Sequence, residues 1–184
     1  MRFEHFLYKL LIFTSAPSFA TFWLPPSSAS SRRAITSKSL ATYSWPNYPV
    51  KRGGVLDAKA LMFISHGYAE HLHPYYDSLG EACAARGLIC WGHDHIGHGT
   101  STGRRTEVNG MENYIKPLVE ACKEKRKEHP GCMNFFSLNL MIFHPGLPLF
   151  LMGHSMGGLI ALMAAIQNPT LFDGLLLTAP LLHR

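Results

Sequence analysis

Four short apolar runs between residues 59 and 178 limit what this chain can fold into. Such runs, bounded by polar residues or glycine, are typical of strands buried on both faces of a sheet. They cover residues 60–64, 88–91, 149–152 and 175–178. Segments of helical character separate them, over residues 75–86, 111–128 and 156–167. Strands that alternate with helices form right-handed βαβ units, so the sequence predicts an α/β fold, a parallel sheet with helices on both faces.

The chain divides near residue 58. Residues 59–184 carry the alternating pattern and are predicted to form a partial α/β domain. Residues 1–58 lack the pattern and are predicted to be a leader or a segment foreign to the domain, poorly ordered. Hydrophobic residues make up 47% of the sequence and charged residues 16%, which excludes wholesale disorder. No apolar run reaches the roughly 20 residues that span a bilayer, which excludes a multi-pass membrane protein.

The net charge of +5 comes from the N-terminal segment. Residues 1–60 hold eight basic residues against two acidic ones, whereas residues 61–184 hold nine against ten. The folded part is near neutral, so we expect no nucleic-acid partner. The apolar residues 10–24 are typical of a secretory signal, whereas the Ser-rich, acid-free residues 27–45 are typical of a transit peptide. A third interpretation is that the segment is not native coding sequence.

One stretch departs from the alternation. Residues 132–146 are apolar and hold no glycine or proline before their end. A His-Pro-Gly tripeptide precedes the stretch, and the same tripeptide closes it. A loop this long and this apolar is unusual. Two hypotheses are open, an insertion produced by splicing and an extra surface helix.

A G-x-S-x-G motif joins the third apolar run to the last helix, with Gly153 and Gly157 on either side of Ser155. In a tight strand-to-helix turn the serine is strained, and the two glycines leave room for the chain. Ser155 Oγ then projects at the carboxyl end of the strand, where the helix N-terminus directs N–H groups at an oxyanion. The motif predicts a nucleophile at Ser155, and the alternative is an ordinary glycine turn.

The segment that follows the first apolar run occupies the place of a second oxyanion donor. In a fold with such a serine turn, a backbone N–H of this loop and the N–H of the residue after the nucleophile both donate to the oxyanion. The predicted donors are the N–H groups of Tyr68 and Met156. His66, Gly67 and His154 are predicted to support them. The alternative is a turn in which His66 only satisfies backbone groups.

Three histidines raise the rival hypothesis of a zinc hydrolase. His93, His95 and His98 match H-x-H-x-D-H except that Gly97 replaces the aspartate, so a metal site would be one ligand short. His71 and His73 are expected to line a rim. The cysteines show no CxxC spacing, which disfavours a zinc ribbon or redox pair and favours buried thiols. They are Cys83, Cys90, Cys122 and Cys132. We therefore predict no metal.

Several segments, in order and spacing, resemble the monoglyceride lipases, which are α/β-hydrolases. They are residues 63–71 (FISHGYAEH), 92–103 (GHDHIGHGTSTG), 146–160 (GLPLFLMGHSMGGLI) and 175–181. The resemblance covers residues 59–182 apart from 132–146 and implies the N-terminal half of an α/β-hydrolase fold. It implies a serine lipase without cofactor that cleaves monoacylglycerol to fatty acid and glycerol through Ser155. The family usually has a small residue where Tyr68 stands, so this side chain is expected to narrow the acyl channel.

A serine nucleophile needs a histidine base oriented by a carboxylate, and in α/β-hydrolases both follow the serine in the chain. After Ser155 the sequence holds one acid, Asp173, and one histidine, His183. The resemblance implies that the family's acid and base come later, after further strands and a cap, so we expect neither residue to belong to a triad. The chain resembles a lipase truncated before the cap, with an open sheet edge after Leu182.

Two function classes remain. The first is an ester hydrolase of the monoglyceride lipase type, acting on monoacylglycerol or another lipid ester at a membrane surface, and inactive in this truncated chain. The second is a non-catalytic fragment, a product of splicing or of a gene model, that binds lipid or a partner through exposed apolar surface. The resemblance favours a cytosolic or membrane-associated location, whereas a signal-like N-terminus would direct the chain elsewhere.

Overall fold

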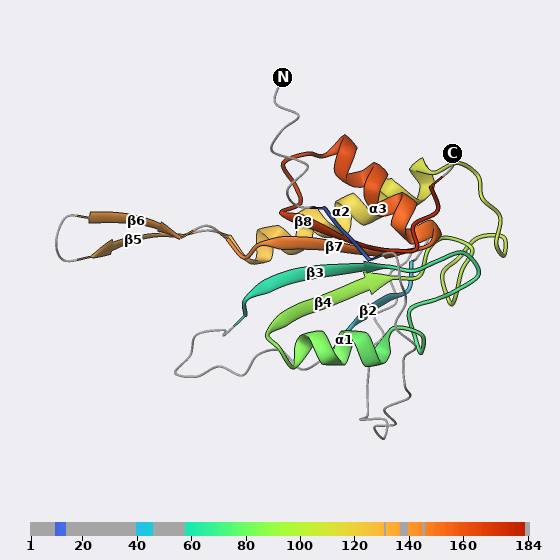
Figure 1. Cartoon of the computed structure of the whole chain (residues 1–184), viewed down its shortest axis with the longest axis horizontal. Helices are drawn as coiled ribbons and strands as arrows, with labels where there is room; N and C mark the ends of the chain where they lie inside the picture. Colours follow the sequence, from blue (N-terminus) through green and yellow to red (C-terminus); the bar gives the residue numbers. More distant parts are fainter. Residues whose placement is uncertain are drawn as a thin grey trace.

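The computed structural model describes residues 10–13, 40–45, 58–130, 132–136, 140–144 and 146–182. Its main sheet has the strand order β1-β8-β7-β3-β4-β2 (Figure 1). Neighbouring strands are parallel except β2, which is antiparallel to β4. The strands are β1 (Leu10–Phe13), β2 (Thr42–Ser44), β3 (Ala60–Ser65), β4 (Leu88–His93), β7 (Leu149–His154) and β8 (Gly174–Thr178). The four apolar runs are therefore β3, β4, β7 and β8, as predicted.

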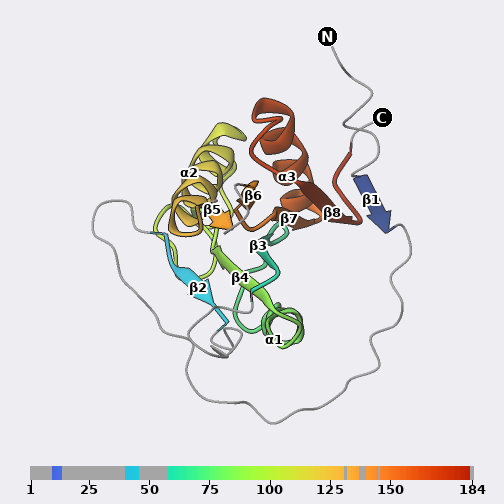
Figure 2. The same ribbon diagram turned by 90° about the vertical axis from the view of Figure 1, so that its left-hand side faces the viewer.

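Helices cover both faces of this sheet (Figure 2). Helix α1 (Asp77–Ala84) lies on one face, whereas α2 (Glu112–Glu128) and α3 (Met156–Gln167) lie side by side on the other. The predicted α/β architecture is confirmed. No helix in the described part of the chain is both long and apolar enough to cross a membrane.

The central strand β3 shows why its sequence is continuously apolar. Leu61 and Phe63 belong to the core cluster formed with α2 and α3, whereas Met62 and Ile64 belong to the cluster on the α1 side. Successive residues of a strand point to opposite faces, so a strand between two helical layers needs apolar residues at every position. All six residues of β3 are buried.

Part of the N-terminal segment joins the sheet. Strand β2 pairs with β4, and the side chains of Tyr43 and Trp45 are 8% and 5% exposed. Trp45 donates from Nε1 to Asp77 Oδ1 at 3.1 Å and lies against Gly80, where an added Cβ would be 2.1 Å from the indole. Residues 42–45 are thus built into the domain, although the sequence pattern placed them in the leader.

Strand β1 lies parallel to β8, with Leu10 opposite Leu175. The expectation of an open edge beside the last strand therefore does not hold. Since β1 pairs along β8, the backbone groups at that edge have partners.

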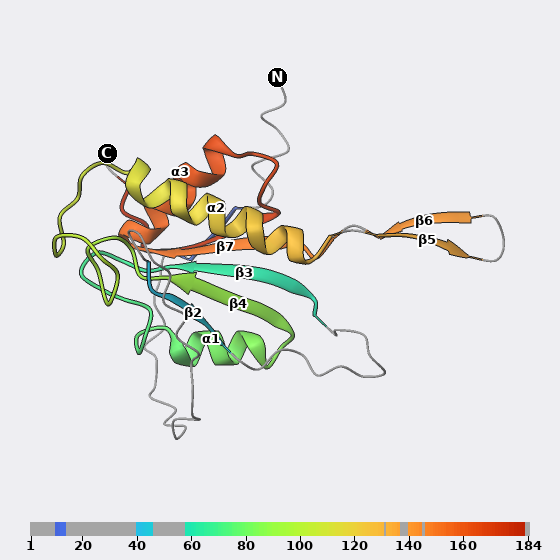
Figure 3. The same cartoon turned by 180° about the vertical axis from the view of Figure 1, so that it is seen from behind.

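Residues 132–146 hold strands, not an extra surface helix. Strands β5 (Cys132–Phe136) and β6 (Leu140–His144) pair antiparallel as a separate two-stranded sheet. Their phenylalanine and isoleucine residues favour strands, and the hairpin satisfies backbone groups that a bare loop would leave unpaired. Figures 1 and 3 show the hairpin extending away from the domain, at the end where β7 begins.

We predict that Trp45→Ala lowers the free energy of unfolding by about 3 kcal/mol or more, because it empties the space above Gly80. Ile166→Ala is the control, since Ile166 is 63% exposed and its loss should change stability by about 0.5 kcal/mol or less. Urea unfolding of both variants measures the difference. Equal midpoints would show that residues 42–45 do not stabilise the domain.

Candidate active site

Ser155 occupies a strained turn between β7 and α3. Its φ is 50° and its ψ is −117°, in a region that residues other than glycine rarely adopt. Two backbone hydrogen bonds join the turn to the C-terminal part of the described chain: Ser155 N–H donates to Thr178 O at 3.0 Å, and Leu181 N–H donates to Ser155 O at 2.9 Å. The end of β8 and the residues after it therefore hold the serine on both sides.

The two glycines of the motif are required by close backbone approach. A Cβ on Gly153 would lie 2.4 Å from Gly157 O, and a Cβ on Gly157 would lie 2.1 Å from Ser65 O and 2.4 Å from His66 O. These distances are too short for any side chain. The first turn of α3 is thus in contact with the end of β3, which places the serine turn beside residues 66–70, here called the 66–70 loop.

The two predicted donor N–H groups belong to the two segments that meet at this junction. Met156 is the first residue of α3, so its N–H has no acceptor within the helix, and the partial positive charge of the helix N-terminus adds to it. Tyr68 lies in the 66–70 loop, two residues beyond His66, whose carbonyl oxygen faces Gly157. The assignment of these two N–H groups as oxyanion donors stays a prediction.

His66 anchors the 66–70 loop in the core. Its Nε2 accepts from His95 N–H at 2.8 Å, so Nδ1 carries the proton and donates to Gly67 O at 2.8 Å. Burial lowers the pKa of His66 to about 4, which keeps the ring neutral. His66 therefore acts as a fixed structural bridge, which favours a supporting role.

Glu70 links the same loop to the serine turn. Its Oε2 accepts from Gly67 N–H at 2.9 Å and from Tyr76 Oη at 2.7 Å. Its Oε1 lies 3.7 Å from Nε2 of His154, and His154 Nδ1 is 3.1 Å from Thr178 Oγ1. Sequence reasoning did not assign roles to Glu70, Tyr76 or Thr178, because their contacts join segments far apart in the chain.

No described side chain forms a hydrogen bond with Ser155 Oγ. Asp173 lies at the opposite end of β7, where its Oδ2 accepts from Leu149 N–H at 2.9 Å and from Arg126 at 3.3 Å. His183 lies outside the described residues. Within the described part, the serine turn is therefore present without a base.

The three histidines of the zinc hypothesis have other partners. His95 Nε2 is 3.1 Å from His66 O, and His98 Nδ1 donates to Ile96 O at 3.0 Å. His93 is fully buried, with its ring edge against Phe63, and burial lowers its pKa to about 3. In the described residues, no three histidine, cysteine or carboxylate groups converge as ligands. The arrangement gives the zinc hypothesis no support.

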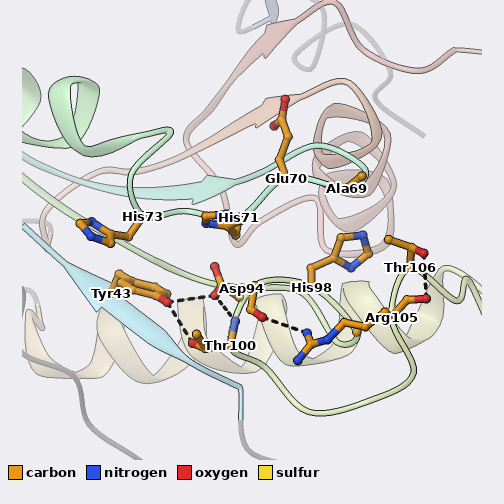
Figure 4. Close-up of a pocket in the computed structure, with 12 residues that line it drawn as sticks. Tyr43, Ala69, Glu70, His71, His73, Asp94, His98, Thr100, Arg105 and Thr106 are labelled. Atoms are coloured by element: carbon orange, nitrogen blue, oxygen red, sulfur yellow. Dashed lines mark hydrogen bonds between the residues drawn. The ribbon is translucent and has the colours of Figure 1, made fainter.

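A cavity of about 350 Å³ lies beside the 66–70 loop (Figure 4). Ala69, Glu70, His71 and His73 line one side of it, which fits the rim position expected for the two histidines. Asp94 forms part of its wall, but its carboxylate accepts from Leu72 N–H, Thr100 N–H and Tyr43 Oη, each at 2.9 Å. Asp94 therefore holds three segments together.

We predict that Gly157→Ala destabilises the domain by about 3 kcal/mol, because its Cβ would overlap the carbonyl oxygens that end β3. Gly110→Ala is the matched control. An added Cβ there meets nothing within 4 Å, and only its φ of +86° opposes the change, at about 1 kcal/mol. Thermal unfolding compares the two, and an equal loss would contradict the close approach.

The free energy of unfolding is predicted to fall as the pH decreases from 7 to 5. Histidines titrate near 6.5 in the unfolded chain, so below that pH the unfolded state binds more protons than a fold that keeps His66 and His93 neutral. The stabilisation is complete above pH 6.5 and is lost as the pH falls towards 4. Each such histidine lowers the free energy of unfolding by about 2 kcal/mol at pH 5, relative to pH 7. Urea unfolding at pH 7 and pH 5 measures it.

His66→Gln tests the assignment, because its amide can replace both hydrogen bonds of the ring without titrating. The variant should lose less stability than the wild type between pH 7 and pH 5. An identical loss in both proteins would rule out His66 as a source of the pH dependence.

Known proteins are similar to this chain over the segment that carries the serine turn. The family model described as "Serine aminopeptidase, S33" matches residues 57–184. The monoglyceride lipase homolog of Monkeypox virus is 37% identical over 125 residues, which are 68% of this chain and 40% of that protein. The monoglyceride lipase of Rattus norvegicus is 36% identical over 124 residues, 67% of this chain and 36% of the relative. The chain thus spans about 40% or less of these relatives.

Solved structures share the fold. A monoacylglycerol lipase of Paleococcus ferrophilus superimposes with a TM-score of 0.56 at 23% identity, over 79% of this chain and 44% of that one. A soluble variant of monoglyceride lipase from Saccharomyces cerevisiae, in complex with a substrate analog, gives a TM-score of 0.56 at 19% identity. The superposition covers 90% of this chain and 48% of that one. With the match over residues 57–184, the chain belongs to the "Serine aminopeptidase, S33" family of α/β-hydrolases.

Proposed function

We propose that this chain provides the nucleophile and the oxyanion hole of a serine ester hydrolase that acts on monoacylglycerols. The observation that carries the proposal is the strained Ser155 turn, held against the end of β3 by Gly157. The family match includes this turn, and the similarity to monoglyceride lipases supports a lipid ester as the substrate. Such esters partition into lipid surfaces, where the enzyme would meet them.

In the proposed reaction, Ser155 Oγ attacks the ester carbonyl carbon and gives up its proton to a base. The N–H groups of Tyr68 and Met156 donate to the oxygen that becomes negatively charged. The bond to the glycerol oxygen then breaks, glycerol leaves with the proton, and the acyl group stays on Ser155. Water hydrolyses this acyl-enzyme and releases the fatty acid.

The described part of the chain offers Ser155 no base, so we propose that the 184-residue chain turns over monoacylglycerol very slowly. Loss of triad function costs about 10⁶ in kcat, while the oxyanion hole alone still accelerates the reaction about 10³-fold over water. A fluorophosphonate probe is far more electrophilic than an ester. It still reacts only slowly with a serine that no base deprotonates, so the labelling rate reports whether Ser155 is both oriented and activated.

The test is labelling of the purified chain with a fluorophosphonate, followed by intact mass. We expect one probe per chain in the wild type, at a slow rate, and none in Ser155→Ala. Ser78→Ala is the matched control, because Ser78 is an exposed serine on α1, and it should be labelled like the wild type.

A folded wild-type chain that takes no label would show that no base activates Ser155, and it would refute a chain that acts as a nucleophile on its own. That outcome would favour the alternative, a non-catalytic fragment that binds lipid or a partner. Labelling that persists in Ser155→Ala would place the reactive group elsewhere.

A further inference from the structure

Tyr68 stands where the resemblance implies a small residue, and its side chain has a defined position. The hydroxyl group donates to Thr106 O at 3.2 Å, and the ring meets the ring of His98 edge-on, with centroids 5.8 Å apart. Half of the side chain remains exposed, at 51%. The ring therefore bridges the 66–70 loop and the segment of residues 97–106, here called the 97–106 loop.

The 97–106 loop, which holds the acceptor Thr106 O, is fixed by hydrogen bonds of its own. Thr106 N–H donates to Gly97 O at 3.0 Å, and Gly97 N–H donates to Thr102 O at 2.8 Å, so the 97–106 loop is closed on itself. His98 is 2% exposed and its Nδ1 is bonded to Ile96 O. Tyr68 thus contacts two groups that have little freedom to move.

The 66–70 loop, which carries Tyr68, has a strained backbone that a contact with the 97–106 loop can stabilise. Ala69 follows Tyr68 with a φ of 58°, a left-handed conformation that costs an alanine about 1 kcal/mol. His66 and Glu70 hold the two ends of the 66–70 loop, through His95 and Tyr76. Among the hydrogen bonds of the described residues, that of the Tyr68 hydroxyl joins the middle of this loop to the 97–106 loop.

We infer that the side chain of Tyr68 is a positioning element that holds its own backbone N–H in the oxyanion hole. This role rests on the proposed function and adds a positioning side chain to the oxyanion hole. Tyrosine has only two side-chain torsions before its rigid ring, so contacts at the hydroxyl group and at the ring edge restrict the backbone that carries them. The residue that donates the N–H thereby also stabilises the conformation in which it donates.

The test compares Tyr68→Phe and Tyr68→Ala with the wild type in the full 184-residue chain. Hydrogen exchange reports the mobility of the amides in the 66–70 loop. We expect exchange about threefold faster in Tyr68→Phe, which loses one hydrogen bond, and about tenfold faster in Tyr68→Ala, which also loses the contact with His98. Tyr75→Phe is the control, because Tyr75 is 65% exposed and meets a histidine ring edge-on without lying in the site.

The second readout is the concentration dependence of fluorophosphonate labelling. A positioned N–H acts on the tetrahedral state, so the maximal labelling rate should fall by about the same factors while the half-saturating concentration stays unchanged. A purely structural role would instead lower the global unfolding midpoint and leave the maximal rate of the folded fraction unchanged.

The outcomes separate the two proposals. Unchanged exchange in Tyr68→Phe, or faster exchange with an unchanged maximal rate, overturns the positioning role. Faster exchange in the variants of a folded chain that is not labelled even as wild type supports the restraint by Tyr68 and overturns the proposed function.

Discussion

The contact between the first turn of α3 and the end of β3 determines the rest of the site. Gly157 lies so close to the carbonyl oxygens of Ser65 and His66 that no side chain fits between them. This contact brings together a serine turn and a loop that are nearly ninety residues apart in the chain. The strain at Ser155 persists because the sheet on one side and the 66–70 loop on the other leave the turn no alternative position.

Polar groups buried around this contact serve mainly as connectors. His66 bridges β3 and the segment after β4, Glu70 bridges the 66–70 loop and His154, and Asp94 joins three backbone or hydroxyl donors. Each connector satisfies donors that would otherwise be buried without partners. In this fold one ring nitrogen of each of His66, His95 and His98 lies in a structural hydrogen bond, and His93 packs against Phe63.

Much of the architecture follows from the sequence because its signals are local. A continuous apolar run such as residues 60–64 indicates a buried strand, and Gly153 to Gly157 between a strand and a helix indicates the serine turn. The parts that the sequence did not predict depend on distant partners. Strand β2 is three residues long and is recognisable only beside β4, and residues 132–146 are ambiguous between helix and strand without the pairing of β5 with β6.

The place of β3 in the sheet also has a consequence for synthesis on the ribosome. Its partner β4 follows after α1 alone, but its other partner β7 is made only after α2 and the pair β5 and β6 as well. Until β7 and α3 emerge, one edge of β3 has no partner strand, and α2 lacks the helix that lies beside it in the same core cluster. The serine turn gains its bond to Thr178 only when β8, the last strand in the chain order, has also been made. The nucleophile can therefore reach its strained position only after nearly the whole domain has been synthesised.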